Sequence, residues 1–447
     1  MLNIRHCAIT IIIFLSFNFS KANYIEILRD AETESFLKNF TKRILESSEP
    51  ALGLVNNTNF LIVNDKSINA FVTPINKVIF IHSGLLVASE NSDTLFGVMA
   101  HETGHLNNYH YIRSLNLEKE QHKLTKVLIS LGTAIINPLL AAGSFVSIMV
   151  DAQDKMIKYS QQNEEEADRH ALKIMKENNI NLKGHANLML YFDKLREESG
   201  VNEKVLEYLS SHPLPKKRLQ KLQRFGMENQ CKVCEQRNLD LEDQFNRIRY
   251  KLSGYLNQTT KLNDILDIRL ENKRKFYELI FSAYSGLSQK KYQEALKDSN
   301  MLINQEPQNP YFYELRSEIH KFIKHDKAIN DIKYAIKLNP KECLFKINLG
   351  NLVLLNKDTK LLKEIKESLK ICQITDQITD YNSILHQIAS LEKDEISILY
   401  YQGLILIKQN HKKDALKKLE QAFALAKEQK SNMMYNIEDI LFELKKK

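Results

Sequence analysis

Residues 95–105 read Leu-Phe-Gly-Val-Met-Ala-His-Glu-Thr-Gly-His, and this stretch decides the fold of the N-terminal half. Its apolar residues follow residues 92–93, Ser-Asp, at helical spacing, which predicts a helix that begins there. His101 and His105 lie four positions apart, so both imidazoles project from one face of that helix and can bind a single metal ion. Glu102 lies beside them, where it can deprotonate a water molecule acidified by zinc. The pattern predicts a zinc-dependent peptidase with one Zn²⁺ per chain.

A catalytic zinc ion takes three protein ligands and keeps one position open. The metzincin pattern needs a third histidine where this chain has Tyr111, and it therefore does not supply the third ligand. We expect the neighbouring His110 on the helix surface. A later helix offers carboxylates in residues 163–168, Asn-Glu-Glu-Glu-Ala-Asp. Glu164 and Asp168 lie one turn apart there, so the first can bind zinc while the second orients a ligand imidazole. The run of three glutamates leaves the identity of the ligand open by one position.

The sequence around this motif predicts further elements of an α+β domain. Apolar residues at helical spacing indicate a helical segment over residues 23–50. Runs rich in β-branched and aromatic residues, separated by turn residues, predict a small sheet with strands at residues 60–63, 70–73 and 78–81. Helical patterns return at residues 161–176 and 185–225.

The pairing of His-Glu-x-x-His with Glu164-x-x-Ala167-Asp168 resembles the gluzincin family of HtpX-like and YfgC-like metallopeptidases over about residues 24–225. Residues 27–32 and 83–86 extend the likeness. The resemblance picks Glu164 among the three glutamates as the third zinc ligand. It also implies an edge strand on which a substrate peptide adds as a further strand, formed by Asn69, Ala70 and Phe71.

The same resemblance assigns roles within residues 211–219, Ser-His-Pro-Leu-Pro-Lys-Lys-Arg-Leu. Taken by themselves, these residues are a loop that leads into a helix with ordinary charges. In the family, the position of Arg218 is placed to stabilise the oxyanion of the tetrahedral intermediate. The position of His212 can approach the metal as a regulatory fourth ligand.

From about residue 240 the pattern becomes repetitive and helical. Ala295 precedes Pro307 by twelve positions and Ala328 precedes Pro340 by twelve, so two units lie 33 residues apart. Residues of the types expected in tetratricopeptide repeats are Phe312, Leu315, Ala328, Ala335, Leu349, Gly350, Gly403, Ala415, Leu419 and Ala422. Such hairpins stack because none buries its apolar face alone, and they offer a concave surface to polypeptides. A generic antiparallel helical array is the alternative.

The predicted fold class is therefore α+β: a mainly helical zincin catalytic domain with a small β-sheet, followed by an all-α tetratricopeptide-type solenoid. We predict a signal peptide at residues 1–22, a zinc metallopeptidase domain at 23–228, a helical connection at 229–264 and a repeat domain at 265–447.

The N-terminus predicts export to the periplasm. Arg5, an apolar run over residues 8–19 and small residues before Ala22 are typical of a signal peptide cleaved after Ala22. Loss of Arg5 and Lys21 lowers the net charge from +8 to +6. The sequence has no dense block of Lys and Arg with interleaved aromatic residues, so nucleic-acid binding is not predicted. The mature chain keeps an even number of cysteines, as suits an oxidising compartment, and three pairings are open to Cys231, Cys234, Cys343 and Cys372.

Residues 127–150 form an apolar run long enough to cross a bilayer. Asn137-Pro138 interrupts it. A single crossing would also put Glu164 and His101 on opposite sides of the membrane, although both are needed on one metal. We expect a helical hairpin that packs on the protein or contacts a membrane surface peripherally.

Signal peptide, catalytic domain and repeats together resemble periplasmic β-barrel assembly-enhancing proteases. The resemblance implies an endopeptidase that hydrolyses misassembled or unfolded envelope proteins, with repeats that bind clients or the outer-membrane protein assembly machinery. The alternative is a chaperone or scaffold for outer-membrane protein assembly whose peptidase activity is latched or vestigial. A membrane-embedded peptidase of the HtpX kind is a third hypothesis, and it requires residues 127–150 to span a bilayer.

Overall fold

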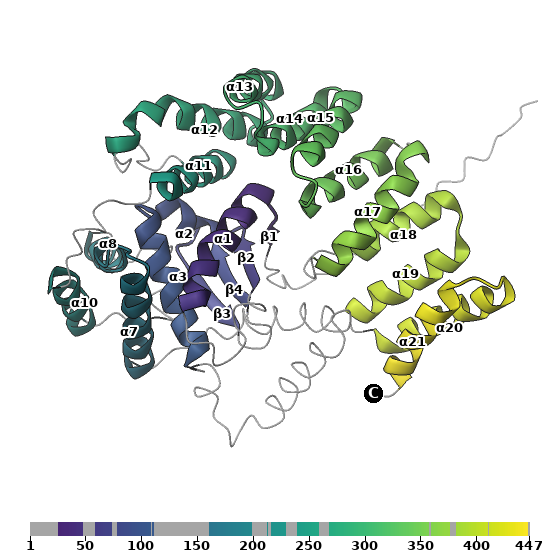
Figure 1. Ribbon diagram of the computed structural model, residues 1–447, viewed down its shortest axis with the longest axis horizontal. Helices are drawn as coiled ribbons and strands as arrows, with labels where there is room; N and C mark the ends of the chain where they lie inside the picture. Colours follow the sequence, from purple (N-terminus) through teal and green to yellow (C-terminus); the bar gives the residue numbers. More distant parts are fainter. Residues whose placement is uncertain are drawn as a thin grey trace, which may run out of the picture.

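The computed structural model describes residues 26–47, 59–73, 78–108, 110, 161–198, 212, 216–228, 239–258, 268–356, 359–375, 381–409 and 411–445. The predicted signal peptide, residues 127–150, Cys231 and Cys234 lie outside these ranges. Figure 1 shows a sheet-containing N-terminal unit on one side and an arc of helices that runs over it to the C-terminus.

Four short strands form one mixed sheet in the N-terminal unit: β1 (Ile27–Leu28), β2 (Asn59–Val63), β3 (Ala70–Thr73) and β4 (Val78–His82). The strand order is β1-β2-β4-β3, with β2 and β4 parallel and the two outer pairs antiparallel. The three strands predicted from the sequence are confirmed. The order places β3 at one edge of the sheet.

The first helix starts later than predicted. We expected helix from residue 23, but Ile27 and Leu28 pair with β2 as strand β1, and α1 covers Ala31–Ser47. Asp30 sets this boundary, because its Oδ1 accepts a hydrogen bond from the backbone N–H of Thr33 at 2.8 Å. A side chain that caps the first turn satisfies a donor that helix geometry leaves open.

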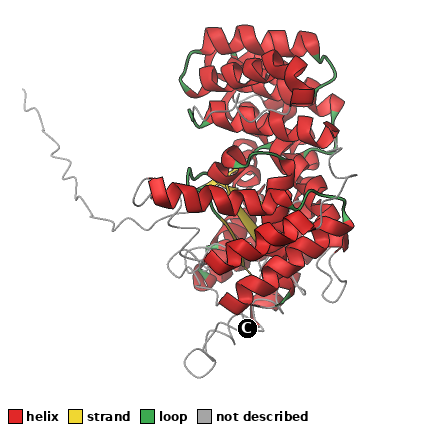
Figure 2. Ribbon diagram, turned by 90° about the vertical axis from the view of Figure 1, so that its left-hand side faces the viewer, coloured by secondary structure: helices red, strands yellow, loops and turns green. Residues whose placement is uncertain are grey.

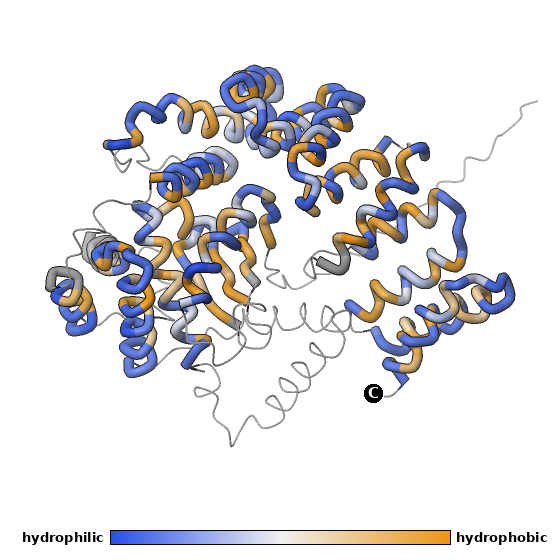
Figure 3. The backbone as a smooth tube through the Cα atoms, in the orientation of Figure 1, coloured by the Kyte–Doolittle hydropathy of each residue, from blue (hydrophilic) through white to orange (hydrophobic). Residues whose placement is uncertain are grey.

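Helices α1, α2 (Ser83–Ala88) and α3 (Ser92–Asn107) pack against the sheet, and α7 (Gln161–Glu177), α8 (Lys183–Glu198), α10 (Lys216–Glu228) and α11 (Leu239–Tyr255) pack against these helices or against one another. Alternate strand residues such as Ile79 and Ile81 join the core of these helices, while Leu61 and Phe80 form a separate apolar cluster on the other face. Residues 92–106 of α3 are all buried, so this helix runs through the centre of the unit, and Figure 3 shows both hydrophobic and hydrophilic turns along its tube.

The arc consists of helices that pack against their neighbours in sequence. They are η2 (Ile268–Lys273), α12 (Arg274–Ser288), α13 (Tyr292–Gln305), α14 (Pro310–Ile323), α15 (His325–Leu338), α16 (Cys343–Asn356), η3 (Thr359–Leu361), α17 (Leu362–Thr375), α18 (Tyr381–Glu392), α19 (Glu395–Lys408), α20 (Lys412–Glu428) and α21 (Met433–Lys445). Ala295, Ala328 and Ala415, which the sequence placed at repeat positions, are fully buried. The expected mainly helical α+β class is confirmed, and Figure 2 shows how few strands lie among the helices.

Helix α11 joins the two parts. Phe245, Ile248 and Leu252 belong to the core that contains the sheet and α3, whereas Tyr250 belongs to the core of the arc. The helix therefore buries side chains on both sides, which ties the arc to the N-terminal unit.

A disulfide joins Cys343 to Cys372, so the start of α16 is linked to α17. Among the described residues, no helix is both long and apolar enough to cross a membrane.

Candidate metal centre

Helix α3 presents the two motif histidines to one buried point. The side chain of Asn91 caps the helix by accepting a hydrogen bond from Thr94 N at 3.0 Å. Three turns later, His101 and His105 lie one above the other, and their Nε2 atoms are 3.1 Å apart. Both histidines and Glu102 are buried. The predicted helical placement of the motif is confirmed.

Helix α7 brings one of the three consecutive glutamates to the histidines. Glu164 is fully buried, and its Oε2 and Oε1 lie 3.4 Å from His101 Nε2 and from His105 Nε2. Glu165 instead points to the surface and pairs with Lys221 at 2.9 Å. The rotation of α7 about its axis therefore selects Glu164 as the carboxylate that faces the histidines.

A glycine inside the motif allows the two helices to approach. A Cβ atom added to Gly104 would lie 3.0 Å from Ala167 Cα and 3.1 Å from Ala167 O. These distances are shorter than an ordinary carbon contact of about 3.5–4.0 Å, so a larger residue would push α7 away from α3. Gly104 and Ala167 together set the distance between the histidines and Glu164.

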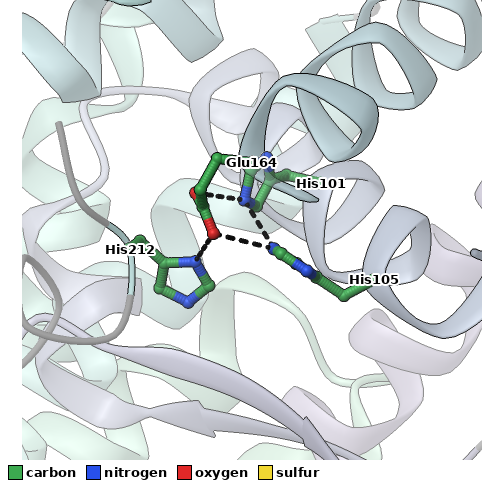
Figure 4. A group of neighbouring side chains, drawn as sticks. All are labelled: His101, His105, Glu164 and His212. Atoms are coloured by element: carbon green, nitrogen blue, oxygen red, sulfur yellow. Dashed lines mark hydrogen bonds and ion pairs between the residues drawn. The ribbon is translucent and has the colours of Figure 1, made fainter. Parts of the chain in front are cut away.

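His212 completes the group (Figure 4). Its Nδ1 lies 3.1 Å from Glu164 Oε1, and its Nε2 lies 3.5 Å from Glu102 Oε1. One ligand atom from each of His101, His105, Glu164 and His212 falls within 4.8 Å of the others, and all four side chains are buried. The structure thus brings His212 to the motif from a separate part of the chain.

Asp168 and Arg218 contact the residues of this group from the side of α7 and α10. Asp168 Oδ1 lies 3.0 Å from His101 Nδ1, the position needed to orient that imidazole. Arg218 pairs with Asp168 through Nε at 2.6 Å and with Glu164 through Nη1 at 2.6 Å. Burial alone would raise the pKa of Asp168, but the charge and hydrogen bonds of Arg218 hold that pKa well below its usual range.

Opposing effects also act on the groups at the centre. Burial alone would lower the pKa of His101, but hydrogen bonds to Asp168 and Glu164 outweigh it and raise the pKa to about 9. Burial lowers the pKa of His105 and raises the pKa of Glu102. Burial would also raise the pKa of Glu164, yet the neighbouring histidines hold it well below the usual range.

Two histidines were misjudged or missed in the sequence. We expected His110 on the helix surface, and this was wrong: it is fully buried, with its Nδ1 2.9 Å from His105 Nδ1. His185 on α8 is also buried, and its Nε2 lies 3.1 Å from Asp168 Oδ1. No spacing pattern marks His185, because only the packing of α8 on α3 brings it to Asp168.

The predicted substrate strand lies at the edge of the sheet. Ala70 and Phe71 belong to β3, which packs against α3, and Asn69 precedes the strand. The backbone O of Asn69 accepts a hydrogen bond from His82 N at 3.0 Å, so this end of the strand is held to β4. An edge strand has a second row of backbone groups available for pairing, as peptide addition requires.

The donor set fits a zinc ion. Imidazole nitrogens and a carboxylate oxygen are zinc ligands, and structural or catalytic sites use three or four of them. Glu102 supplies a further observation: it is fully buried, yet neither of its carboxylate oxygens accepts a hydrogen bond from any residue in the described ranges. Such a group is costly unless another species pairs with it.

Comparison with known proteins agrees with this geometry. Residues 37–225 match Peptidase family M48. The beta-barrel assembly-enhancing protease of Escherichia coli is 26% identical over 305 residues, which cover 65% of this chain and 59% of that protein. Its Yersinia pestis counterpart is 27% identical over 299 residues, 65% of this chain and 60% of that protein. The mitochondrial metalloendopeptidase OMA1 of Schizosaccharomyces pombe is 27% identical over 176 residues, 38% of this chain and 47% of that protein.

The matched region spans about three fifths of the length of the two bacterial relatives. The resemblance predicted from the sequence motifs is confirmed, because residues 37–225 match a family of metallopeptidases.

Proposed function

We propose that this chain, which carries a Peptidase family M48 domain, is a zinc-dependent endopeptidase. One observation carries the proposal: ligand atoms of His101, His105, Glu164 and His212 meet at one buried point. Glu102 lies beside that point with no hydrogen bond from the described residues to its carboxylate.

In this proposal His101, His105 and Glu164 hold one zinc ion. When bound, the zinc ion would act as a Lewis acid that polarises a peptide carbonyl and lowers the pKa of a bound water molecule. Glu102 takes the proton of the attacking water and passes it to the leaving amine. The carboxylate of Asp168, 3.0 Å from His101 Nδ1, favours a proton on that nitrogen, so that the lone pair of Nε2 is directed at the centre. Asn69, Ala70 and Phe71 hold the substrate backbone at the sheet edge.

Arg218 is proposed to stabilise the oxyanion. Its guanidinium contacts Glu164 and Asp168 in this structure, so the role requires one of its N–H groups to turn toward the substrate carbonyl. In this structure its positive charge lies next to the carboxylates of Glu164 and Asp168.

A first experiment separates metal binding from chemistry. We expect wild-type protein to contain one zinc per chain and to degrade casein, and chelation to remove both properties. Glu102→Gln should keep the zinc and lose about 100-fold or more of the activity, because only the proton-transfer group changes. Glu165→Gln is the matched control, since Glu165 is exposed on α7 and should leave both readouts unchanged. Retained cleavage by Glu102→Gln would exclude the assignment.

We further propose that His212 acts as a latch, as the fourth ligand of the resting site. The contacts of His212 with Glu164 and Glu102 support this, because they put its ring between the proposed third ligand and the proposed base. His212→Ala should raise the rate of casein cleavage without changing the zinc content. A rate equal to or below that of wild type contradicts the latch.

The chain is proposed to work in the periplasm, exported by residues 1–22, on misassembled or unfolded envelope proteins. The names of the bacterial relatives support this, and so does the disulfide between Cys343 and Cys372, since such bonds persist in oxidising compartments. The arc is proposed to be a tetratricopeptide-type solenoid that binds clients or assembly machinery. The buried alanines at the repeat positions support the solenoid.

The second candidate is a chaperone or scaffold for outer-membrane protein assembly, and the placement of His212 over the centre favours it. If the non-proteolytic role suffices, Glu102→Gln will complement a deletion strain as well as wild type does. If proteolysis is required, that variant will fail while Glu165→Gln succeeds. Carbonate extraction tests the proposed peripheral membrane contact of residues 127–150.

A further inference from the structure

His110 lies beyond the end of α3 and outside the metal-binding motif, yet its side chain is fully buried and contacts His105 of that motif. Its two ring nitrogens have different partners. Nδ1 lies 2.9 Å from Nδ1 of His105, and Nε2 lies 3.0 Å from Oε2 of Glu166 on α7. The ring therefore bridges one proposed metal ligand and one carboxylate.

With an ionised Glu166 and a neutral His110, these two contacts are compatible with one arrangement of the protons. An ionised carboxylate only accepts hydrogen bonds, so His110 donates to Glu166 from an N–H at Nε2. A neutral His110 then has a lone pair at Nδ1, and this lone pair accepts the Nδ1 proton of His105. A neutral His105 protonated at Nδ1 keeps the lone pair on Nε2, the atom that lies 3.1 Å from His101 Nε2 and 3.4 Å from Glu164 Oε1.

We infer that Glu166 and His110 form a positioning relay that sets the tautomer and ring orientation of His105 for metal binding. The inference rests on the proposed function, because the centre toward which His105 Nε2 is directed is the proposed zinc site. The two ligand histidines are thus supported differently: Asp168 contacts His101 directly, whereas Glu166 reaches His105 through a second imidazole.

The relay also explains the three consecutive glutamates. Glu164 faces the histidines, Glu166 faces His110, and Glu165 between them is exposed beside Lys221. Gln162 donates to the second oxygen of Glu166 at 3.1 Å, which orients that carboxylate from one turn earlier on α7. A glutamate two positions from Glu164 thus has a defined partner of its own.

Zinc affinity measured by chelator competition on the full chain tests the relay. Glu166→Gln removes the charge that sets the proton on His110, and His110→Phe removes the acceptor for His105 while keeping a ring of similar size. Both should weaken zinc binding about 10- to 100-fold. Glu165→Gln, the adjacent matched control, should bind zinc within about twofold of wild type. His110→Asn can still offer an acceptor near the position of Nδ1 and should recover part of the loss.

A double variant distinguishes a relay from separate packing effects. Because Glu166 acts through His110, His110→Phe combined with Glu166→Gln should weaken zinc binding no more than His110→Phe alone. Circular dichroism melts of each variant show that the comparison is made on folded protein, and Glu166→Gln, partly exposed, should melt as wild type does.

Wild-type affinity in both His110→Phe and Glu166→Gln, or additive losses in the double variant, would overturn the relay and leave the proposed function standing. A wild-type chain that binds no zinc would overturn both.

Discussion

Gly97 marks a close approach of α3 to α8, one turn before His101. A Cβ atom added there would lie 2.6 Å from His185 Cβ and 3.0 Å from His185 Cα. Carbon atoms in ordinary contact are about 3.5–4.0 Å apart, so α8 would have to move by about 1 Å to accept a methyl group. The obstructing atoms belong to the backbone and to the first side-chain carbon, which a change of rotamer does not move.

The magnitude follows from three contributions. Overpacking a tight contact costs about 1–3 kcal/mol. Replacing glycine by alanine in a helix returns about 1 kcal/mol. The movement of α8 also weakens the buried 3.1 Å hydrogen bond between His185 and Asp168, at a cost of about 1 kcal/mol. We therefore expect Gly97→Ala to lower the free energy of unfolding by about 1–3 kcal/mol.

Urea unfolding followed by far-ultraviolet circular dichroism measures the effect, because the chain has no Trp for fluorescence. Gly350→Ala is the matched control. It lies in helix α16, where an added Cβ would have its nearest neighbours at 3.4 Å, an ordinary contact. That variant should be as stable as wild type or gain up to about 1 kcal/mol. If Gly97→Ala unfolds at the same urea concentration as Gly350→Ala, the packing argument is refuted.

Three further predictions concern the arc and its junction with the N-terminal unit. Replacing both Cys343 and Cys372, 29 residues apart, by Ser should lower the stability of the arc by about 3 kcal/mol, and urea unfolding of reduced wild type should reproduce the loss. Lys251→Met should cost about 3–5 kcal/mol in the same assay, because it leaves the mostly buried carboxylates of Asp30 and Glu32 without their cation. Burial and the charge of Asp30 raise the pKa of Glu314 well above its usual range, so its stabilising contribution is present in acid and lost as the pH rises through the raised pKa. Glu314→Gln should therefore stabilise the protein at neutral pH but not in acid, and equal effects at both pH values would contradict this.

Local periodicity explains what could be predicted from the sequence. The four-residue spacing of His101 and His105 puts them on one face of any helix, and alternating apolar residues define strands wherever they pair. The alanines of the arc mark close helix contacts for the same reason, since a helical hairpin repeats its packing along the chain. These features depend on residues within about two helical turns of one another, or on a regular repeat.

The centre of the site required the tertiary structure. Three adjacent glutamates are equivalent as a pattern of composition, so the sequence singled out Glu164 only through the family resemblance. The rotation of α7 against α3 is the physical reason that Glu164 faces the histidines while Glu166 faces His110. The surface position expected for His110 was wrong because it assumed an isolated helix, and the packing of α7 beyond the helix end buries it. His185 reaches Asp168 only because Gly97 lets α8 approach α3.

The sequence alone thus predicted the groups of the candidate site: two imidazoles and a glutamate on one helix, a carboxylate on a second, and a repetitive helical C-terminal half. The packing of the elements shows how α7 turns Glu164 toward the histidines, how His110 and His185 join the group, and how His212 reaches it. The physical reason is that a helix fixes angles between near neighbours in the chain, whereas the contacts of Glu164, His110 and His212 depend on how separate elements pack.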